Sequence, residues 1–192
     1  MTPDPHQPDP GQSGELSQGA AALVAALVEL ERHVGESGWD SPSRLFALVH
    51  TEALLAAEPA LADQLRPDGL ELPEGALTAV EQEDFLPDDR ASDDLLTALG
   101  EIVWPDTVFG CALATERAFL PASAEADLPD DPAEAAAYVA DHPDREDVRV
   151  VVGVDRAGNR HGIGRLASRP DDLLGGADLV PGLSAALAHT LS

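Results

Sequence analysis

The sequence predicts an α+β protein, with about four mostly antiparallel strands packed by helices in a single compact domain. Valines recur at every second position over residues 148–154, a pattern typical of a strand. A turn signal follows at residues 155–158, and residues 160–168 can return as the second strand of a hairpin. Leucine and valine recur at helical spacing over residues 16–34. A hairpin and an amphipathic helix in one short chain predict the mixed class.

The first 14 residues differ in composition from the rest of the chain. They contain four prolines and no aliphatic residue beyond Met1. Such a segment cannot bury enough apolar surface to fold, so we expect a disordered N-terminal tail over residues 1–14. Residues 15–192 show no internal repeat and have the length of one domain. We therefore expect a single α+β domain over residues 15–192.

Four further helices and one short turn or helix are expected. A polar residue followed by proline at positions 41–42 predicts the start of a second helix, which Pro59 would end. Ser92 can cap a short helix over residues 93–103. The remaining helical segments are a short turn or helix over residues 60–65 and two helices over residues 133–140 and 181–191.

Two strands are expected before the hairpin. Residues 77–85 alternate loosely between apolar and polar side chains. Residues 107–119 are apolar on both faces, which predicts a central strand covered on both sides. Together with the hairpin they make the expected four-stranded sheet.

The chain is strongly acidic. Its formal net charge is −25, and all 11 of its Lys and Arg residues are arginine. Long-range repulsion then disfavours nucleic acid and anionic membranes as partners, and we expect neither. No apolar run is long enough to span a bilayer and the N-terminal region carries no Lys or Arg, so we expect a cytoplasmic protein. The composition favours a proteome-wide bias as the origin of the acidity, although a basic protein partner remains compatible with it.

No sequence pattern indicates a catalytic or metal-binding site. Cys111 lies in an apolar predicted strand, where a buried and inert thiol is expected. The six histidines show no short-spaced pair, and the aspartate clusters at residues 88–94 and 127–131 do not match a calcium-binding loop. Residues 162–167 match the glycine pattern of dinucleotide-binding loops, but they fall inside a predicted strand with no helix after it. We expect no cofactor and no metal.

Arginines concentrate around the predicted hairpin. Residues 145–169 hold six arginines and three acids, a local charge of +3, while the rest of the chain sums to −28. If Gly158 is the left-handed residue of a three-residue loop, Arg149 lies directly opposite Arg165. Like charges opposite each other destabilise a sheet unless something neutralises them. An anionic ligand, a partner's carboxylates or the protein's own acids could do so, and the excess of acids elsewhere favours the last.

The same register defines a candidate contact face. If the protein's own acids do not cover it, this face would bind a small anion, an acidic partner or a second subunit, because the arginine fork grips carboxylates and phosphates at two points. The face consists of Arg149, Val151, His161, Ile163 and Arg165.

Three stretches of the sequence resemble a known family. They are residues 37–51, residues 101–121, and residues 144–162 taken with residues 179–187. They are similar to an uncharacterised family of small acidic actinobacterial proteins, and the likeness spans nearly all of the chain after the tail. The resemblance implies no activity and assigns no catalytic residue.

Two classes of function remain open. The favoured one is a non-enzymatic cytosolic binding or regulatory protein that acts through protein–protein contacts, with a homodimer as one possible form. The alternative is a small hydrolase or transferase whose dispersed Asp, Glu and Arg residues converge only in the folded protein. A deep pocket with perturbed titratable groups would favour the enzyme, and an exposed apolar surface would favour the binding protein.

Overall fold

The computed structural model describes residues 17–65, 71–83, 85, 95–121, 124, 127–177 and 179–192. The tail expected over residues 1–14 lies outside them. The described residues form one antiparallel sheet of six strands in the order β2-β1-β3-β4-β5-β6. These are β1 (Arg44–His50), β2 (Leu77–Gln82), β3 (Gly110–Phe119), β4 (Glu146–Asp155), β5 (Arg160–Leu166) and β6 (Arg169–Gly176).

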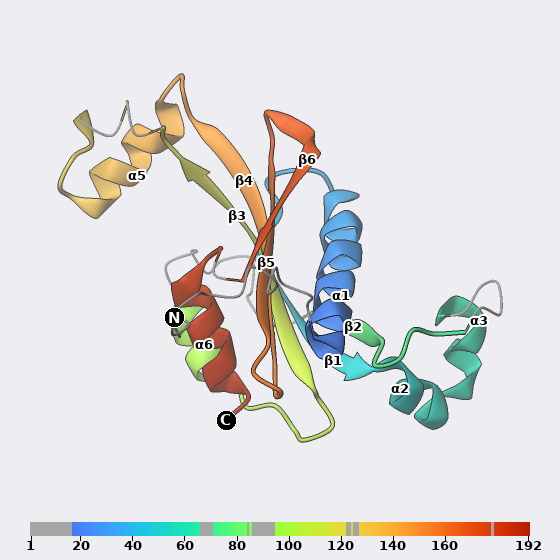
Figure 1. Ribbon diagram of the computed structural model, residues 1–192. Helices are drawn as coiled ribbons and strands as arrows, with labels where there is room; N and C mark the ends of the chain where they lie inside the picture. Colours follow the sequence, from blue (N-terminus) through green and yellow to red (C-terminus); the bar gives the residue numbers. More distant parts are fainter. Residues whose placement is uncertain are drawn as a thin grey trace, which may run out of the picture.

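Helices cover both faces of the sheet (Figure 1). Helix α1 lies on one face and helices α4 and α6 lie on the other. Helix α5 lies near the end of β3 and the start of β4. The helices are α1 (Gln18–Gly35), α2 (Thr51–Ala57), α3 (Ala62–Leu65), α4 (Leu95–Gly100), α5 (Pro132–Asp141) and α6 (Pro181–Thr190), with a 3-10 turn at Pro59–Leu61. No helix among the described residues is long and apolar enough to cross a bilayer.

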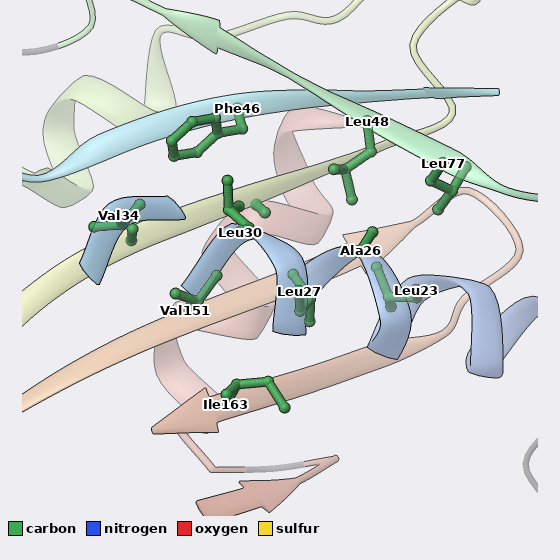
Figure 2. Close-up of a cluster of buried hydrophobic side chains, with 12 residues drawn as sticks. Leu23, Ala26, Leu27, Leu30, Val34, Phe46, Leu48, Leu77, Val151 and Ile163 are labelled. Atoms are coloured by element: carbon green, nitrogen blue, oxygen red, sulfur yellow. The ribbon is translucent and has the colours of Figure 1, made fainter. Parts of the chain in front are cut away.

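The core consists of two aliphatic layers, one on each side of the sheet. On the α1 side, a leucine stripe of the helix packs against inward-facing residues of the central strands (Figure 2). The buried residues of this layer include Leu23, Leu27, Leu30, Phe46, Leu48, Val151 and Ile163. On the other side, alternate residues of the same strands pack against α4 and α6. Burial on both faces explains why residues 110–114 of β3 read as a continuous apolar run.

The helix expected between residues 41 and 59 is wrong in its first half. Residues 44–50 form strand β1, and only residues 51–57 are helical, as α2. Leu45 and Ala47 face the α4–α6 layer, whereas Phe46 and Leu48 face α1. A strand buried on both faces loses its alternation, and a short apolar run of this kind cannot be told from a buried helix by periodicity.

The expected number of about four strands is too low. Besides β1, the sequence pattern does not predict β6, which runs Arg-Pro-Asp-Asp-Leu-Leu-Gly-Gly and is exposed along most of its length. Proline, aspartate and glycine usually indicate a turn, but an edge strand tolerates them because one side of its backbone pairs with nothing.

The other expected elements are present with small shifts at their ends. Helix α1, strands β2 and β3, the β4–β5 hairpin and helices α5 and α6 all lie where the sequence predicts them. The expected helix over residues 93–103 is represented by α4, and its proposed cap, Ser92, lies outside the described residues.

Candidate functional site

The predicted register of the arginine hairpin is confirmed. Gly158 has a φ of +87°, and the Asp155 amide donates to the Asn159 carbonyl at 3.0 Å. In this register Arg149 lies opposite Arg165, and Val151 lies opposite Ile163. The two like charges do meet across the β4–β5 pair, so each needs a counter-charge.

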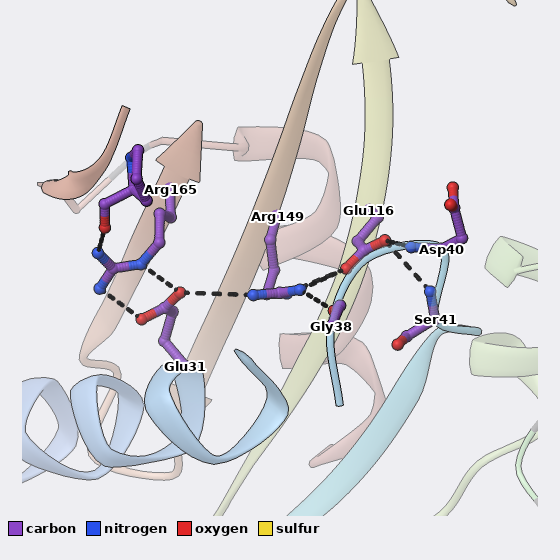
Figure 3. Close-up of polar contacts among 8 residues, drawn as sticks. Glu31, Gly38, Asp40, Ser41, Glu116, Arg149 and Arg165 are labelled. Carbon is purple, nitrogen blue, oxygen red and sulfur yellow. Dashed lines mark hydrogen bonds and ion pairs between the residues drawn. The ribbon is translucent and has the colours of Figure 1, made fainter. Parts of the chain in front are cut away.

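Helix α1 provides a counter-charge for both arginines (Figure 3). Arg165 donates from Nε to Oε1 of Glu31 at 2.7 Å and from Nη2 to Oε2 at 2.8 Å. Oε1 of Glu31 also lies 3.9 Å from Nη1 of Arg149. Glu31 is only 2% exposed, and its hydrogen bonds are the main reason that the pKa of Arg165 is raised.

Strand β3 provides the second carboxylate. Arg149 donates to Oε1 of Glu116 from Nε at 3.0 Å and from Nη2 at 2.8 Å, and it also donates to the Gly38 carbonyl. The other oxygen of Glu116 accepts from the backbone amides of Asp40 and Ser41. Because Glu116 and Glu31 flank Arg149, the cluster fastens both α1 and the segment after it to the sheet.

Three of the five residues of the predicted contact face are interior. Val151 and Ile163 are buried beneath α1, and the Arg149 side chain is 3% exposed. Arg165 keeps 24% of its side chain exposed. His161 is half-buried, and burial lowers its pKa. The protein's own acids neutralise the arginines, as the charge imbalance favoured, and any partner contact by Arg165 or His161 stays a prediction.

Within the arginine cluster, the charges of Arg149 and Arg165 are balanced by those of Glu31 and Glu116. Every buried side-chain nitrogen or oxygen among the described residues has a hydrogen-bond partner. Polar networks that are satisfied in this way make the structure rigid and specify one packing arrangement. We assign this cluster a structural role.

An apolar groove lies on the opposite flank of α1. It has a volume of about 630 Å³ and runs between α1 and β2, with the segment before β2 as its second wall. Its floor includes Phe46, Leu77 and Ala79. The α1 wall consists of Gln18, Ala21, Ala22, Ala25, Ala26, Glu29, Leu30 and His33, and the second wall includes Leu65, Leu72, Pro73 and Glu74.

Small side chains on α1 keep this groove open. Residues three and four apart share one side of a helix, so Ala21, Ala22 and Ala25 form a stripe beside the buried leucines. The leucines hold α1 to the centre of the sheet, but a methyl group is too short to fill the space between α1 and β2. The groove therefore forms because the side of α1 that faces β2 carries alanines and not larger side chains.

The rim of the groove carries carboxylates. Glu81 pairs with Arg44, from Nε to Oε1 at 2.5 Å and from Nη2 to Oε2 at 2.5 Å, and these bonds lower the pKa of Glu81. Glu74 accepts from Nε2 of Gln18 at 3.0 Å. Within the described part of the chain, Glu29 and Glu74 form no ion pair, so both can still pair with a cation.

Sequence reasoning missed the groove. Most of its lining comes from residues 18–33 and residues 72–81, which are too far apart in the chain to be joined by any pattern. The alanine stripe of α1 was a visible signal, since a helix facing a filled core on that side would carry larger residues there.

Two other sequence interpretations have structural outcomes. Cys111 is fully buried, and burial raises the pKa of its thiol to about 11, which agrees with an inert residue. The glycine pattern at residues 162–167 lies in β5 and the turn after it, as expected. No group of three or more metal-ligating side chains occurs among the described residues.

Comparison with known proteins identifies the family. The profile of the PPA1309-like protein family matches residues 23–192. The chain belongs to this family. The PPA1309-like match begins within α1 and continues through α6, and it confirms the resemblance to an uncharacterised family. It includes the second wall of the groove and the α1 wall from Ala25 onward. Nothing among the curated proteins or the solved structures matches the chain.

Proposed function

We propose that this protein is a non-enzymatic binding or regulatory protein that holds an apolar segment of a partner protein in the groove between α1 and β2. The observation that carries the proposal is the groove itself, an open apolar volume of about 630 Å³. Two carboxylates on its rim, Glu29 and Glu74, form no ion pair among the described residues. Its volume falls within the range of about 300–1,000 Å³ that is typical of ligand sites.

The length of the groove favours a chain segment over a small molecule. Its lining on α1 extends from Gln18 to His33, a distance of about 22 Å at 1.5 Å per helical residue. An extended chain of about seven residues has the same length. A compact small molecule would fill only part of this groove.

The groups in the groove support binding more than catalysis. General acid–base or nucleophilic chemistry needs a side chain with a shifted pKa and a second group to activate it. Arg44 holds Glu81 as an ion pair with a lowered pKa, which suits an anchoring role and not that of a general acid. The alternative of a small hydrolase or transferase stays a prediction that a measured turnover would revive.

Photo-crosslinking from two positions of α1 tests the proposal. Benzoylphenylalanine replaces Ala25, which lines the groove, or Val28, which is 39% exposed on the same helix outside it. We expect position 25 to crosslink in cells to one segment of one other protein, with the adduct mapped by mass spectrometry, and position 28 to give no such adduct. Equal adducts from both positions, or none from position 25, would overturn the proposal.

A further inference from the structure

The two edges of the sheet differ in how they are protected against pairing. Strand β6, at one edge, carries Pro170 followed by Asp171 and Asp172. Proline and charge on an edge strand prevent another strand from adding to it. Strand β2, at the other edge, reads Leu-Thr-Ala-Val-Glu-Gln and has no proline. Its one charged residue, Glu81, is held by Arg44.

The main chain of β2 faces the groove. Successive side chains of a strand point to opposite faces, so a groove that met only one face would be lined by every second residue. Within β2 the groove is lined by Leu77, Ala79 and Glu81, which share one face of the strand, and also by Thr78, which belongs to the other face. It therefore reaches the edge of β2, where β2 pairs with no strand other than β1 among the described residues.

We propose that the partner segment binds as an extended strand that adds to the free edge of β2 and carries lysine or arginine beside Glu29 and Glu74. This inference rests on the proposed function. Edge pairing gives affinity through main-chain hydrogen bonds, and every second side chain of the added strand enters the groove. The alanine stripe of α1 leaves room there for aliphatic side chains such as valine.

The positions of the rim carboxylates predict where the basic side chains of the partner segment lie. Glu74 is bound to Gln18, and Glu29 is 11 residues further along α1. This separation is about 16 Å along the helix, or about five residues of an extended chain. A segment with aliphatic residues at alternate positions, and basic residues four or six positions apart on the other side of the strand, would match both features.

A second copy of this chain is a poorer occupant. Each copy has a formal net charge of −25, and pairing two β2 edges would bring the carboxylates of both rims together. Repulsion between like charges opposes that arrangement.

Defined probes test the mode of binding on the full-length protein. One probe is a nine-residue peptide that alternates valine with lysine, and a second replaces lysine with glutamate. Two further versions of the lysine peptide carry N-methyl groups on the valine amides or on the lysine amides. The neutral dye N-phenyl-1-naphthylamine reports on the groove independently of any peptide.

We expect the lysine peptide to bind about tenfold or more tightly than the glutamate peptide. One N-methylated version should lose about tenfold or more in affinity, while the other stays within about twofold. Amides at alternate positions of a strand point to opposite sides, so only one set can pair with β2, and each bond contributes. The Ala25→Phe variant should bind both the peptide and the dye more weakly, and the Val28→Phe variant should bind both as the parent protein does.

Each other outcome is decisive. Equal affinity of the lysine and glutamate peptides, or equal effects of the two N-methylations, would overturn the inference. Dye binding that Ala25→Phe abolishes, without peptide binding, would overturn strand addition and leave the proposed function standing. If neither dye nor peptide binds, the proposed function fails as well. A dimer in native mass spectrometry that Ala25→Phe dissociates would identify a second copy as the occupant and overturn the inference.

Discussion

Glu31 and Arg165 join helix α1 to strand β5 through two parallel hydrogen bonds of 2.7 and 2.8 Å. Arg149 and Arg165 lie opposite each other and would repel, but Glu31 neutralises both of them. The same contacts attach α1 to the sheet. The attachment lies on the flank of α1 that faces β4 and β5, and the groove lies on the other flank. One helix thus separates a satisfied polar cluster from an open apolar surface.

Removing the Glu31 carboxylate should strongly destabilise the protein. In Glu31→Ala, Arg149 stays buried with only Glu116 as a counter-ion, and Arg165 loses both of its carboxylate bonds. Breaking a buried ion pair on one side costs about 3–5 kcal/mol, because it leaves a charge without compensation. Urea denaturation measures the free energy of unfolding.

The matched control is Glu29→Ala, two residues away on the same helix. Glu29 is exposed and forms no ion pair among the described residues, so its loss should change stability by less than about 0.5 kcal/mol. Equal effects of the two substitutions would contradict the role assigned to the cluster.

The Arg44–Glu81 pair should contribute much less, and its contribution should disappear in acid. The two side chains are 18% and 32% exposed, and exposed pairs contribute about 0.2–1 kcal/mol. Arg44 lowers the folded-state pKa of Glu81 from 4.5. The stabilisation is therefore complete above pH 4.5 and is lost as the pH falls through the lowered value.

A double-mutant cycle with Arg44→Gln and Glu81→Gln measures this coupling. We expect a positive coupling energy at pH 7 that decreases below pH 4.5. A coupling energy independent of pH would show that the pair acts through packing and not through charge.

The sequence predicted local pairing better than packing. Alternating valines and Gly158 were enough to place Arg149 opposite Arg165, because a hairpin register depends on a few neighbouring residues. The partner, Glu31, was not identified, although it lies four residues after Leu27 and three before Val34, within the buried stripe of α1. A charge at a core position of a helix is a signal of a buried pair that the sequence did contain.

The elements that the sequence did not predict depend on distant contacts. Strand β1 is buried between two helical layers, so its sequence does not alternate between apolar and polar residues and cannot be recognised by its periodicity. The groove depends on where the edge of the sheet lies relative to α1. No property of residues 18–33 alone fixes the position of β2.

A methyl group at Gly110 should disrupt the pairing of β3 with β4. A Cβ atom at this position would lie 2.5 Å from the Val154 carbonyl oxygen and 3.2 Å from Asp155. The clash is with backbone, so the strands must separate, and overpacking of this kind costs about 1–3 kcal/mol. Thermal or urea unfolding of Gly110→Ala measures the loss.

Gly176→Ala is the matched control for this substitution. Gly176 also lies in a strand, but a Cβ atom there meets nothing within 4 Å. We expect its stability to stay within about 0.5 kcal/mol of the parent protein. A similar loss in both variants would mean that the cost comes from the strand environment in general and not from the contact at Gly110.

Burial of Cys111 should make the protein less stable in alkaline solution. The pKa of its thiol rises from 9.0 in water to about 11 in the folded protein. Below pH 9 the thiol is protonated in both states, and stability does not depend on it. Between pH 9 and 11 the unfolded chain releases the proton while the folded chain retains it, so the unfolded state is favoured and stability falls. The slope approaches about 1.4 kcal/mol per pH unit at most.

Comparing the native protein with Cys111→Ala isolates this effect. The variant loses packing at every pH, but it lacks the thiol, so its free energy of unfolding should decline less between pH 9 and 11. Ellman's reagent provides a second measurement. The native protein should react slowly at pH 8 and quickly once urea unfolds it, because only the thiolate attacks and the folded protein keeps the thiol protonated and covered. Parallel pH profiles for the two proteins, together with fast labelling in the absence of urea, would mean that Cys111 is accessible in the folded protein.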